Sequence, residues 1–208
     1  MINMVVLGPP GSGKDTQIDE LVKFMDLQLI SGGDIARTLA SKSAKYKKIV
    51  DEGGLIDDSV ITKEIDKMLS EAPVDKGIVF DGFPRTLRQA EVLGEVLLHH
   101  GRNLDVVIYI DLDEKCIVNR LSKRRVCSIC GHNVCNGSEQ CHDCGGGAVR
   151  RVDDEPAVII KRVQTFLENT LPLVNYYRNK GIILEIDGDQ SIKAVASDIK
   201  VKLGDVTK

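Results

Sequence analysis

The residues with the clearest chemical purpose lie in a glycine-rich loop near the amino terminus, within MINMVVLGPPGSGKDTQ. A strand before this loop and a helix after it would point successive backbone N–H groups at one concavity, where the positive end of the helix favours an anion. Glycine permits close approach of a phosphate, and Lys14 can reach its outer oxygens. A glycine-rich turn with a surface lysine is the alternative, which the flanking strand and helix disfavour. The residues expected around the phosphate are Gly8, Gly11, Ser12, Gly13, Lys14, Asp15 and Thr16.

Asp15 departs from the general nucleotide-binding pattern, in which Ser or Thr follows the lysine. A carboxylate at this position would repel phosphate unless it turned outward. Thr16, one residue later, could supply the hydroxyl instead. The loop therefore predicts phosphate binding and leaves the reaction open.

Four cysteines form a second constellation, with ten residues between two Cys-x-x-Cys pairs: Cys127 with Cys130, and Cys141 with Cys144. In a cytosolic protein this spacing is typical of a zinc ribbon rather than of disulfides, and a redox pair is the competing interpretation. Four thiolates leave no open coordination position, so the predicted zinc would be structural. Cys116 is expected in the core. Possible substitute ligands are Cys135, His132 and His142.

Basic residues gather on either side of the cysteine-rich segment. Four of the six residues from Arg120 to Arg125 are basic, and further basic residues follow at 150, 151, 161 and 162. One such run is usually a solvated helix face, but two runs bracketing one insert favour a focused anion site. The net charge of −3 argues against a general nucleic-acid coat, which needs excess Lys and Arg.

Short apolar runs alternate with helical patterns along the chain, which predicts an α/β fold with a five-stranded parallel sheet. Right-handed crossovers would place a binding site at the carboxyl ends of the strands. Asp154-Glu155-Pro156 predicts a helix start, with Asp154 as the cap and the proline in the first turn. The expected strands are Ile2 to Leu7, Leu27 to Ile30, Gly77 to Phe80, Val106 to Ile110 and Ile182 to Ile186.

Length and composition limit the size and location of the protein. With 208 residues and 42% hydrophobic content, one domain with appendages is expected. The longest apolar runs, such as Val106 to Ile110, are too short to cross a bilayer, and the amino terminus lacks a secretory pattern. A cytoplasmic protein without membrane partners is therefore predicted.

Four further stretches, ISGGDIAR, EGGLIDD, DGFPRTLRQ and RRVDDEP, follow the loop in that order. Together with the loop they resemble the adenylate kinase family of nucleoside monophosphate kinases, in its zinc-lid form, over essentially the whole chain. The resemblance implies a P-loop NTPase-like three-layer fold with a helical NMP-binding insert and a zinc-ribbon lid. The expected parts are a core of residues 1–30, 60–122 and 154–208, an NMP-binding insert of 31–59, and a zinc-binding lid of 123–153.

The resemblance also implies the reaction: reversible, magnesium-dependent phosphoryl transfer from ATP to AMP, giving ADP, for adenine nucleotide homeostasis. Two polyanions must meet in line, so positioning and charge neutralisation dominate, and guanidinium groups suit both tasks. Asp81 would hold magnesium and its waters, with a helix cap as the alternative role. By resemblance the catalytic residues are Lys14, Asp81, Arg85, Arg120, Arg124, Arg151 and Arg162.

The two nucleotide sites follow from the same resemblance. ATP would contact the glycine-rich loop together with Arg120, Arg124 and Gln190. The Gln89 carboxamide could both donate to and accept from the edge of the acceptor adenine. The residues expected around AMP are Gly32, Arg37, Gly54, Leu55, Ile56, Gly82, Arg85, Gln89, Arg151 and Arg162.

Two departures from the family pattern bear on base selection. Gly32 stands where adenylate kinases commonly have Thr, so a hydroxyl near the acceptor is missing. Val134 and Cys135 occupy the region where an aromatic residue or His often lies against the donor base. GTP as donor, or another base as acceptor, therefore remains open at this stage.

Two other classes of protein share some of these features. A zinc-ribbon nucleic-acid binder with an ATPase core should be basic and carry exposed aromatics, which this chain does not. A nucleotide-binding module without turnover would keep the loop but could lose the arginines. We therefore expect an active, monomeric enzyme whose partners are ATP, AMP and ADP, with magnesium and structural zinc and without nucleic acid.

Overall fold

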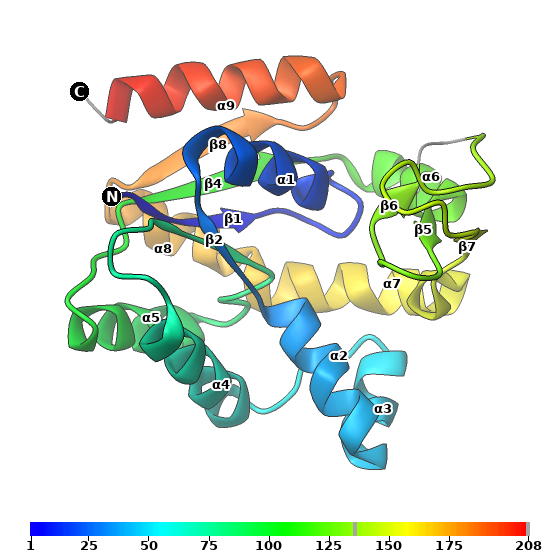
Figure 1. Ribbon diagram of the computed structural model, residues 1–208, viewed down its shortest axis with the longest axis horizontal. Coiled ribbons are helices and arrows are strands. Elements are labelled where there is room, and N and C mark those ends of the chain that lie inside the picture. The colour runs from blue at the N-terminus through cyan, green and yellow to red at the C-terminus, as the bar shows by residue number, and fades with distance from the viewer. Residues whose placement is uncertain (135–136, 207–208) are drawn as a thin grey trace.

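Five parallel strands lie at the centre of the molecule in the order β2-β3-β1-β4-β8 (Figure 1). The structure is a computed structural model that describes residues 1–134 and 137–206, so Cys135 lies outside the described residues. The sequence-based prediction of the strands is confirmed to within one residue at each end. The strands are β1 (Asn3–Leu7), β2 (Gln28–Ser31), β3 (Ile78–Asp81), β4 (Val106–Asp111) and β8 (Ile183–Asp187).

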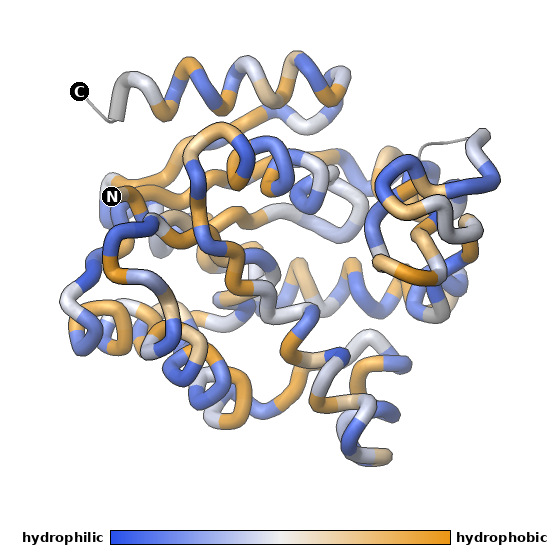
Figure 2. Tube along the Cα trace, in the orientation of Figure 1, coloured by the Kyte–Doolittle hydropathy of each residue, from blue (hydrophilic) through white to orange (hydrophobic). Residues whose placement is uncertain are grey.

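The sheet is buried on both faces, which explains its continuous apolar runs. In β1 all five residues are buried, and successive side chains point to opposite sides. Met4 and Val6 join one hydrophobic cluster, whereas Val5 and Leu7 join the other. Figure 2 shows the same concentration of hydrophobic residues along the central strands.

Helices cover both faces of the sheet and complete three layers (Figure 1). Helices α1 and α9 pack on one face, and α4, α5 and α8 on the other. This confirms the predicted three-layer α/β fold. Within the described residues, no helix is long and apolar enough to span a membrane. The helices of these layers are α1 (Lys14–Met25), α4 (Asp58–Glu71), α5 (Leu87–His99), α8 (Pro172–Asn179) and α9 (Ile192–Val206).

Two small substructures project beyond the layers, in the regions where inserts are predicted (Figure 1). The first is a helix pair, α2 (Gly32–Lys42) and α3 (Ala44–Asp51), which follows β2 directly. The second is an antiparallel sheet of order β6-β5-β7. Its strands are β5 (Arg125–Cys127), β6 (Asn133–Val134) and β7 (Ala148–Val149).

Helices on either side of the small sheet carry it at one end of the molecule. Helix α6 (Glu114–Lys123) leads into it, and α7 (Pro156–Thr165) leaves it after a 3-10 turn at Val152–Asp154. Pro156 opens α7 as predicted, but the residue before the helix is Glu155. The prediction that Asp154 caps this helix is wrong, because its carboxylate binds arginines instead. A π-helical segment, Phe166–Thr170, joins α7 to α8.

Candidate active site and metal centre

The glycine-rich loop joins the end of β1 to the start of α1, as predicted. Gly13 precedes the helix with φ of 91°, in the left-handed region that glycine enters without strain. At Gly8 an added Cβ would lie 2.6 Å from the carbonyl oxygen of Ile110, so no side chain fits there. Lys14 Nζ donates hydrogen bonds to the carbonyl oxygens of Gly8 (2.9 Å) and Pro9 (3.1 Å). The Lys14 ammonium group therefore lies beside the glycine-rich loop that precedes it.

The two hydroxyl side chains of the loop differ in their surroundings. Ser12 is 3% exposed, and within the described part of the chain its hydroxyl has no hydrogen-bond partner. Thr16 lies partly exposed in the first turn of α1. Because a buried hydroxyl is normally bonded, the loop offers Ser12 to a polar ligand.

One cavity of about 230 Å³ gathers most of the predicted catalytic side chains beside the loop. It is lined by Gly11, Gly13 and Lys14 of the loop and by Asp81 at the carboxyl end of β3. Asn133 and Val134 of the small sheet close part of it. The cavity therefore lies at the sheet edge where parallel α/β folds bind ligands. All six predicted arginines line it: Arg37, Arg85, Arg120, Arg124, Arg151 and Arg162.

A fully buried carboxylate holds two of these arginines. Asp154, 0% exposed, accepts from Arg124 Nε (2.8 Å) and Nη2 (2.6 Å) in the paired geometry that suits guanidinium. Arg162 Nη1 lies 3.0 Å from the same carboxylate. Burial first, and then neighbouring arginines, lower the pKa of Arg162 to about 10, so it stays charged at neutral pH. Asp154 thus joins the ends of α6 and α7 behind the cavity.

The other arginines have partners of their own. Arg151 forms a paired contact with Asp153, at 2.8 and 2.6 Å, and Arg37 contacts Asp34 at 2.6 Å. Arg120 donates to the carbonyl oxygen of Gly188 (2.9 Å), and Arg85 Nε donates to that of Gly82 (2.8 Å). The contacts of Arg85, Arg120 and Arg151 orient their guanidinium groups, whereas the contact of Arg37 is an exposed surface ion pair.

Two carboxylates of the cavity have opposite electrostatic surroundings. Burial disfavours the charged form of Asp15, but Lys14, Arg124 and Arg151 outweigh it and lower the pKa of this carboxyl. Asp15 lines the cavity together with Asn133 of the small sheet, so it does not turn outward. For Asp81, burial and then the charge of Asp15 raise the pKa. Asp81 is thus a carboxylate whose charge is poorly compensated by the protein alone.

Gln89 lies beside Arg85 in a network that the sequence did not reveal. Its side chain is buried, and Oε1 accepts from the backbone N–H of Arg85 (2.7 Å). Nε2 donates to Asp58 Oδ1 (2.7 Å), and the Thr86 hydroxyl donates to Asp58 Oδ2 (2.9 Å). The carboxylate of Asp58 therefore fixes the orientation of the Gln89 amide, because a carboxylate can only accept hydrogen bonds and must face the NH₂ group.

The predicted AMP-binding residues at positions 32 and 54–56 do not line the arginine-lined cavity. Gly32 begins α2, and an added Cβ would lie 2.7 Å from the carbonyl oxygen of Gly82. This close approach explains physically why a side chain, and with it a hydroxyl, is missing at position 32. Gly54 donates its N–H to Ile49 (2.9 Å). Leu55 is half-buried, and Ile56 is buried in the core beneath the sheet.

Gln190 lies away from the arginine-lined cavity, after β8. Its Nε2 donates to the carbonyl oxygen of Asp187 (3.1 Å) and to Asp198 (3.0 Å). The neighbouring Gly188 and Asp189 contact Arg120, which does line the cavity. The segment after β8 is therefore linked to the cavity through Arg120.

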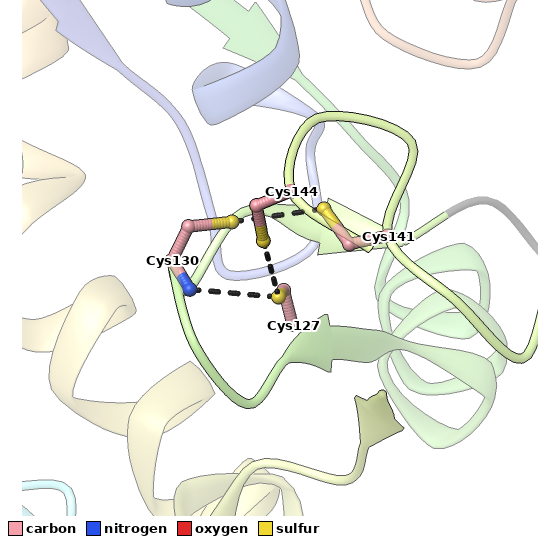
Figure 3. Close-up of side chains that lie close together, drawn as sticks. All are labelled: Cys127, Cys130, Cys141 and Cys144. Atoms are coloured by element: carbon pink, nitrogen blue, oxygen red, sulfur yellow. Dashed lines mark hydrogen bonds between the residues drawn. The ribbon is translucent and has the colours of Figure 1, made fainter. Parts of the chain in front are cut away.

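The four cysteines converge, with their sulfur atoms pointing toward one another (Figure 3). Cys127 and Cys144 Sγ lie 3.3 Å apart, and Cys130 and Cys141 Sγ 3.6 Å apart. Tetrahedral zinc with bonds of about 2.3 Å would place its sulfurs about 3.8 Å apart, so the set fits this ion closely. The backbone N–H groups of Cys130 and Ile129 point at Cys127 Sγ and lower the pKa of this thiol to about 6. A thiolate, the form that binds zinc, is thereby favoured at Cys127, whereas at Cys130 the backbone bond of His132 is outweighed by burial and by hydrogen bonds with the other cysteines, which raise the pKa of that thiol.

Histidines next to this cluster have other contacts. His132 Nδ1 lies 2.8 Å from Asp143, in a small group with Cys130. The four sulfur ligands are complete among the described residues, without His132 or His142. Cys116, which we expected in the core, is only half-buried at the edge of a small hydrophobic cluster, with its sulfur 3.6 Å from Asp189.

A three-layer fold whose first strand runs through a glycine-rich loop into a helix, with arginines gathered around that loop, defines a phosphotransferase of the P-loop class. The model of the family described as Adenylate kinase matches residues 6–182. An adenylate kinase of Kosmotoga olearia is 37% identical, over 95% of this chain and 97% of the relative. Those of Archaeoglobus fulgidus and Bacillus subtilis are each 35% identical, over 97% and 100% of this chain and 98% and 100% of the relative. The chain belongs to the adenylate kinase family and is an enzyme that transfers a phosphoryl group between ATP and AMP.

Proposed function

We propose that the arginine-lined cavity is where the phosphoryl group passes from ATP to AMP. The observation that carries this proposal is that Lys14 and the six arginines line one cavity beside the glycine-rich loop. In this assignment the loop, Ser12 and Thr16 bind the phosphates of ATP, with Arg120 and Arg124 beside them. Arg37 and Arg85 bind the phosphate of AMP. Arg151 and Arg162 contact the group in transfer, whose spread negative charge they stabilise.

The division into a core, an NMP-binding insert at 31–59 and a lid at 123–153 belongs to this proposal. Arg124 and Arg151 lie on either side of the small sheet, which supports their moving together with it. Such a lid would exclude water, which would otherwise take the phosphoryl group from ATP. Asp15 of the loop and Asn133 of the small sheet line the same cavity, which supports a lid that closes on the loop.

Both metals fit the residues present. Zinc would be held by the four thiolates in a closed, structural site that keeps the short lid segment rigid. Magnesium, bound with ATP, would be held through waters by Asp81, whose poorly compensated carboxylate suits a divalent cation. Bound there, the ion supplies charge neutralisation between the phosphates.

Selection of the acceptor base is assigned to Gln89. Asp58 orients the Gln89 NH₂ group. The two bonds described above leave one lone pair of Oε1 and one N–H of Nε2 for a ligand. These can pair with N1 and the N6 amino group of adenine, and they mismatch guanine, whose corresponding edge has the reverse polarity. The alternative of another donor or acceptor base is not favoured by the family match.

A monomeric, cytoplasmic enzyme is the form we propose. Four cysteines arranged as metal ligands support a reducing compartment.

Product analysis tests the assignment directly. Wild-type protein is mixed with magnesium ATP or GTP and with AMP, GMP, CMP or UMP, and the products are separated by chromatography. ADP from ATP and AMP alone is expected. Arg85→Ala should lower turnover by about 10³-fold or more, the range known for arginines that stabilise phosphoryl transfer, with an unchanged circular dichroism spectrum. Near-normal turnover of a folded Arg85→Ala protein would contradict the assignment of this cavity.

A further inference from the structure

Two histidines and an aspartate form a cluster far from the four cysteines. Asp66 lies on α4, His99 is the last residue of α5, and His100 directly follows that helix. In Figure 1 these helices lie on the opposite side of the molecule from the β6-β5-β7 sheet. The cluster is therefore separate from both the predicted zinc centre and the arginine-lined cavity.

The three side chains are close enough to share one ion. Each offers one ligand atom, and these atoms lie within 4.8 Å of one another. His100 Nε2 is 2.7 Å from Asp66 Oδ1, and the two imidazole rings meet edge-on with centroids 5.2 Å apart. Ligand atoms around a tetrahedral zinc lie about 3.3 Å apart, so small side-chain rotations would suffice.

The surroundings of the cluster favour a cation. The cluster lies at the carboxyl end of α5, where the helix dipole is negative. Glu95, four residues before His99 on the same helix face, lines the same groove between α4 and α5, a hollow of about 560 Å³ that Lys63 and Arg88 also line. Asp66 is half exposed and His99 is exposed, so water can reach the site.

The ligand types decide the class of ion. Imidazole nitrogen suits zinc, copper, nickel and cobalt, whereas magnesium and calcium prefer oxygen ligands. Three protein ligands leave room for water, in contrast to the closed set of four sulfurs. We propose that Asp66, His99 and His100 bind one divalent transition-metal ion of the zinc class, which ties α4 to α5.

The simpler role for the cluster is the hydrogen bond between His100 and Asp66 alone, which would fasten the two helices without metal. The two roles differ in their response to added zinc. Loss of the bond would lower the melting temperature whether or not zinc is present, whereas loss of a metal site removes the increase in melting temperature that zinc produces. His99→Gln is the sharper probe, because it leaves the bond between His100 and Asp66 in place.

The test uses the whole chain loaded beforehand with one equivalent of zinc, which the four cysteines would hold. Zinc is titrated by isothermal calorimetry in the presence of excess magnesium, and melting temperatures are measured with and without zinc. We expect one additional zinc per chain in the wild type, and an affinity at least about tenfold weaker in His99→Gln and in His100→Gln, since lesser changes around metal ligands already cost this much. His132→Gln, which removes a histidine beside the four cysteines, is the matched control and should keep the additional zinc.

The proposal is overturned if wild-type protein takes up no additional zinc, or if magnesium competes equally for the site. It is also overturned if His99→Gln keeps both the affinity and the zinc-dependent rise in melting temperature. Binding is measured without nucleotides, so these outcomes are independent of whether the arginine-lined cavity performs the reaction.

Discussion

Replacing Asp154 with Asn tests whether one buried carboxylate organises the arginines. Asp154 is 0% exposed and accepts two bonds from Arg124 and one from Arg162, whose side chains are only 15% and 19% exposed. Breaking a buried ion pair costs about 3–5 kcal/mol, and because Asn keeps one acceptor oxygen we expect a loss of about 2–4 kcal/mol. At about 2–4 °C per kcal/mol for a chain of this size, the melting temperature should fall by roughly 4–16 °C. Turnover should fall by about tenfold or more, because both guanidinium groups lose their positions.

The assay combines urea unfolding, followed by circular dichroism, with measurement of kcat from product formation. Asp153→Asn is the matched control: Asp153 pairs with Arg151, but both side chains are about one-fifth exposed, so its loss of stability should be smaller. An Asp154→Asn protein whose melting temperature stays within about 1 °C of the wild type would refute the reasoning. So would a larger loss of stability in Asp153→Asn than in Asp154→Asn.

Three further changes have defined outcomes. Asp81→Asn should raise the free energy of unfolding at pH 7, because burial and Asp15 raise the pKa of the native carboxyl and its ionisation therefore opposes folding. This gain in stability should vanish below about pH 3.9, where the carboxyl is protonated in the unfolded chain as well. Turnover of the variant should fall at least about 100-fold. Thermal melts at both pH values and a product assay check this, and a less stable Asp81→Asn at pH 7 would contradict it. Asp58→Asn should raise the KM for AMP about 2- to 10-fold with little change in kcat, because the Gln89 amide loses a charged hydrogen-bond acceptor. Steady-state kinetics measure both constants, and a fall in kcat would indicate that Asp58 has a structural role instead. Cys144→Ser should abolish stoichiometric zinc binding and make the lid unfold at a lower temperature than the core. Metal analysis and calorimetry test this, and a variant with one zinc per chain and an unchanged melting curve would contradict it.

Features governed by local sequence could be predicted closely. The five strands are short apolar runs bounded by turns, and all lie within one residue of their predicted ends. The basic runs around the cysteine pairs indicated a focused anion site, and the arginines do line one cavity. The cysteine spacing likewise predicted a cluster that the structure contains. Their roles in binding and catalysis stay predictions.

Features that depend on distant partners could not be predicted. Asp154 before Glu155-Pro156 has the local pattern of a helix cap, but its partner Arg124 lies thirty residues earlier. Asp58 bonds Gln89 across thirty-one residues, and such a pair leaves no local pattern. From the sequence, a carboxylate at position 15 would repel phosphate unless it turned outward, yet Asp15 lines the cavity. Lys14, its neighbour in the sequence, offsets part of that repulsion, but Arg124 after α6 and Arg151 beyond the small sheet approach Asp15 only in the folded chain.

Aspartates of the protein itself act as counterions for the arginines of the cavity. Among the described residues, seven cationic side chains line the cavity, but Asp15 and Asp81 line it too, and Asp153 and Asp154 bind three of the arginines from behind. A single phosphate gains less from entering a site whose positive charge is already partly balanced than it would from a bare cluster of arginines. A ligand that carries several negative charges can replace these carboxylates as the partner of several arginines at once. The balance thus favours nucleotides over the inorganic phosphate and isolated anions that would otherwise occupy a bare cluster of arginines.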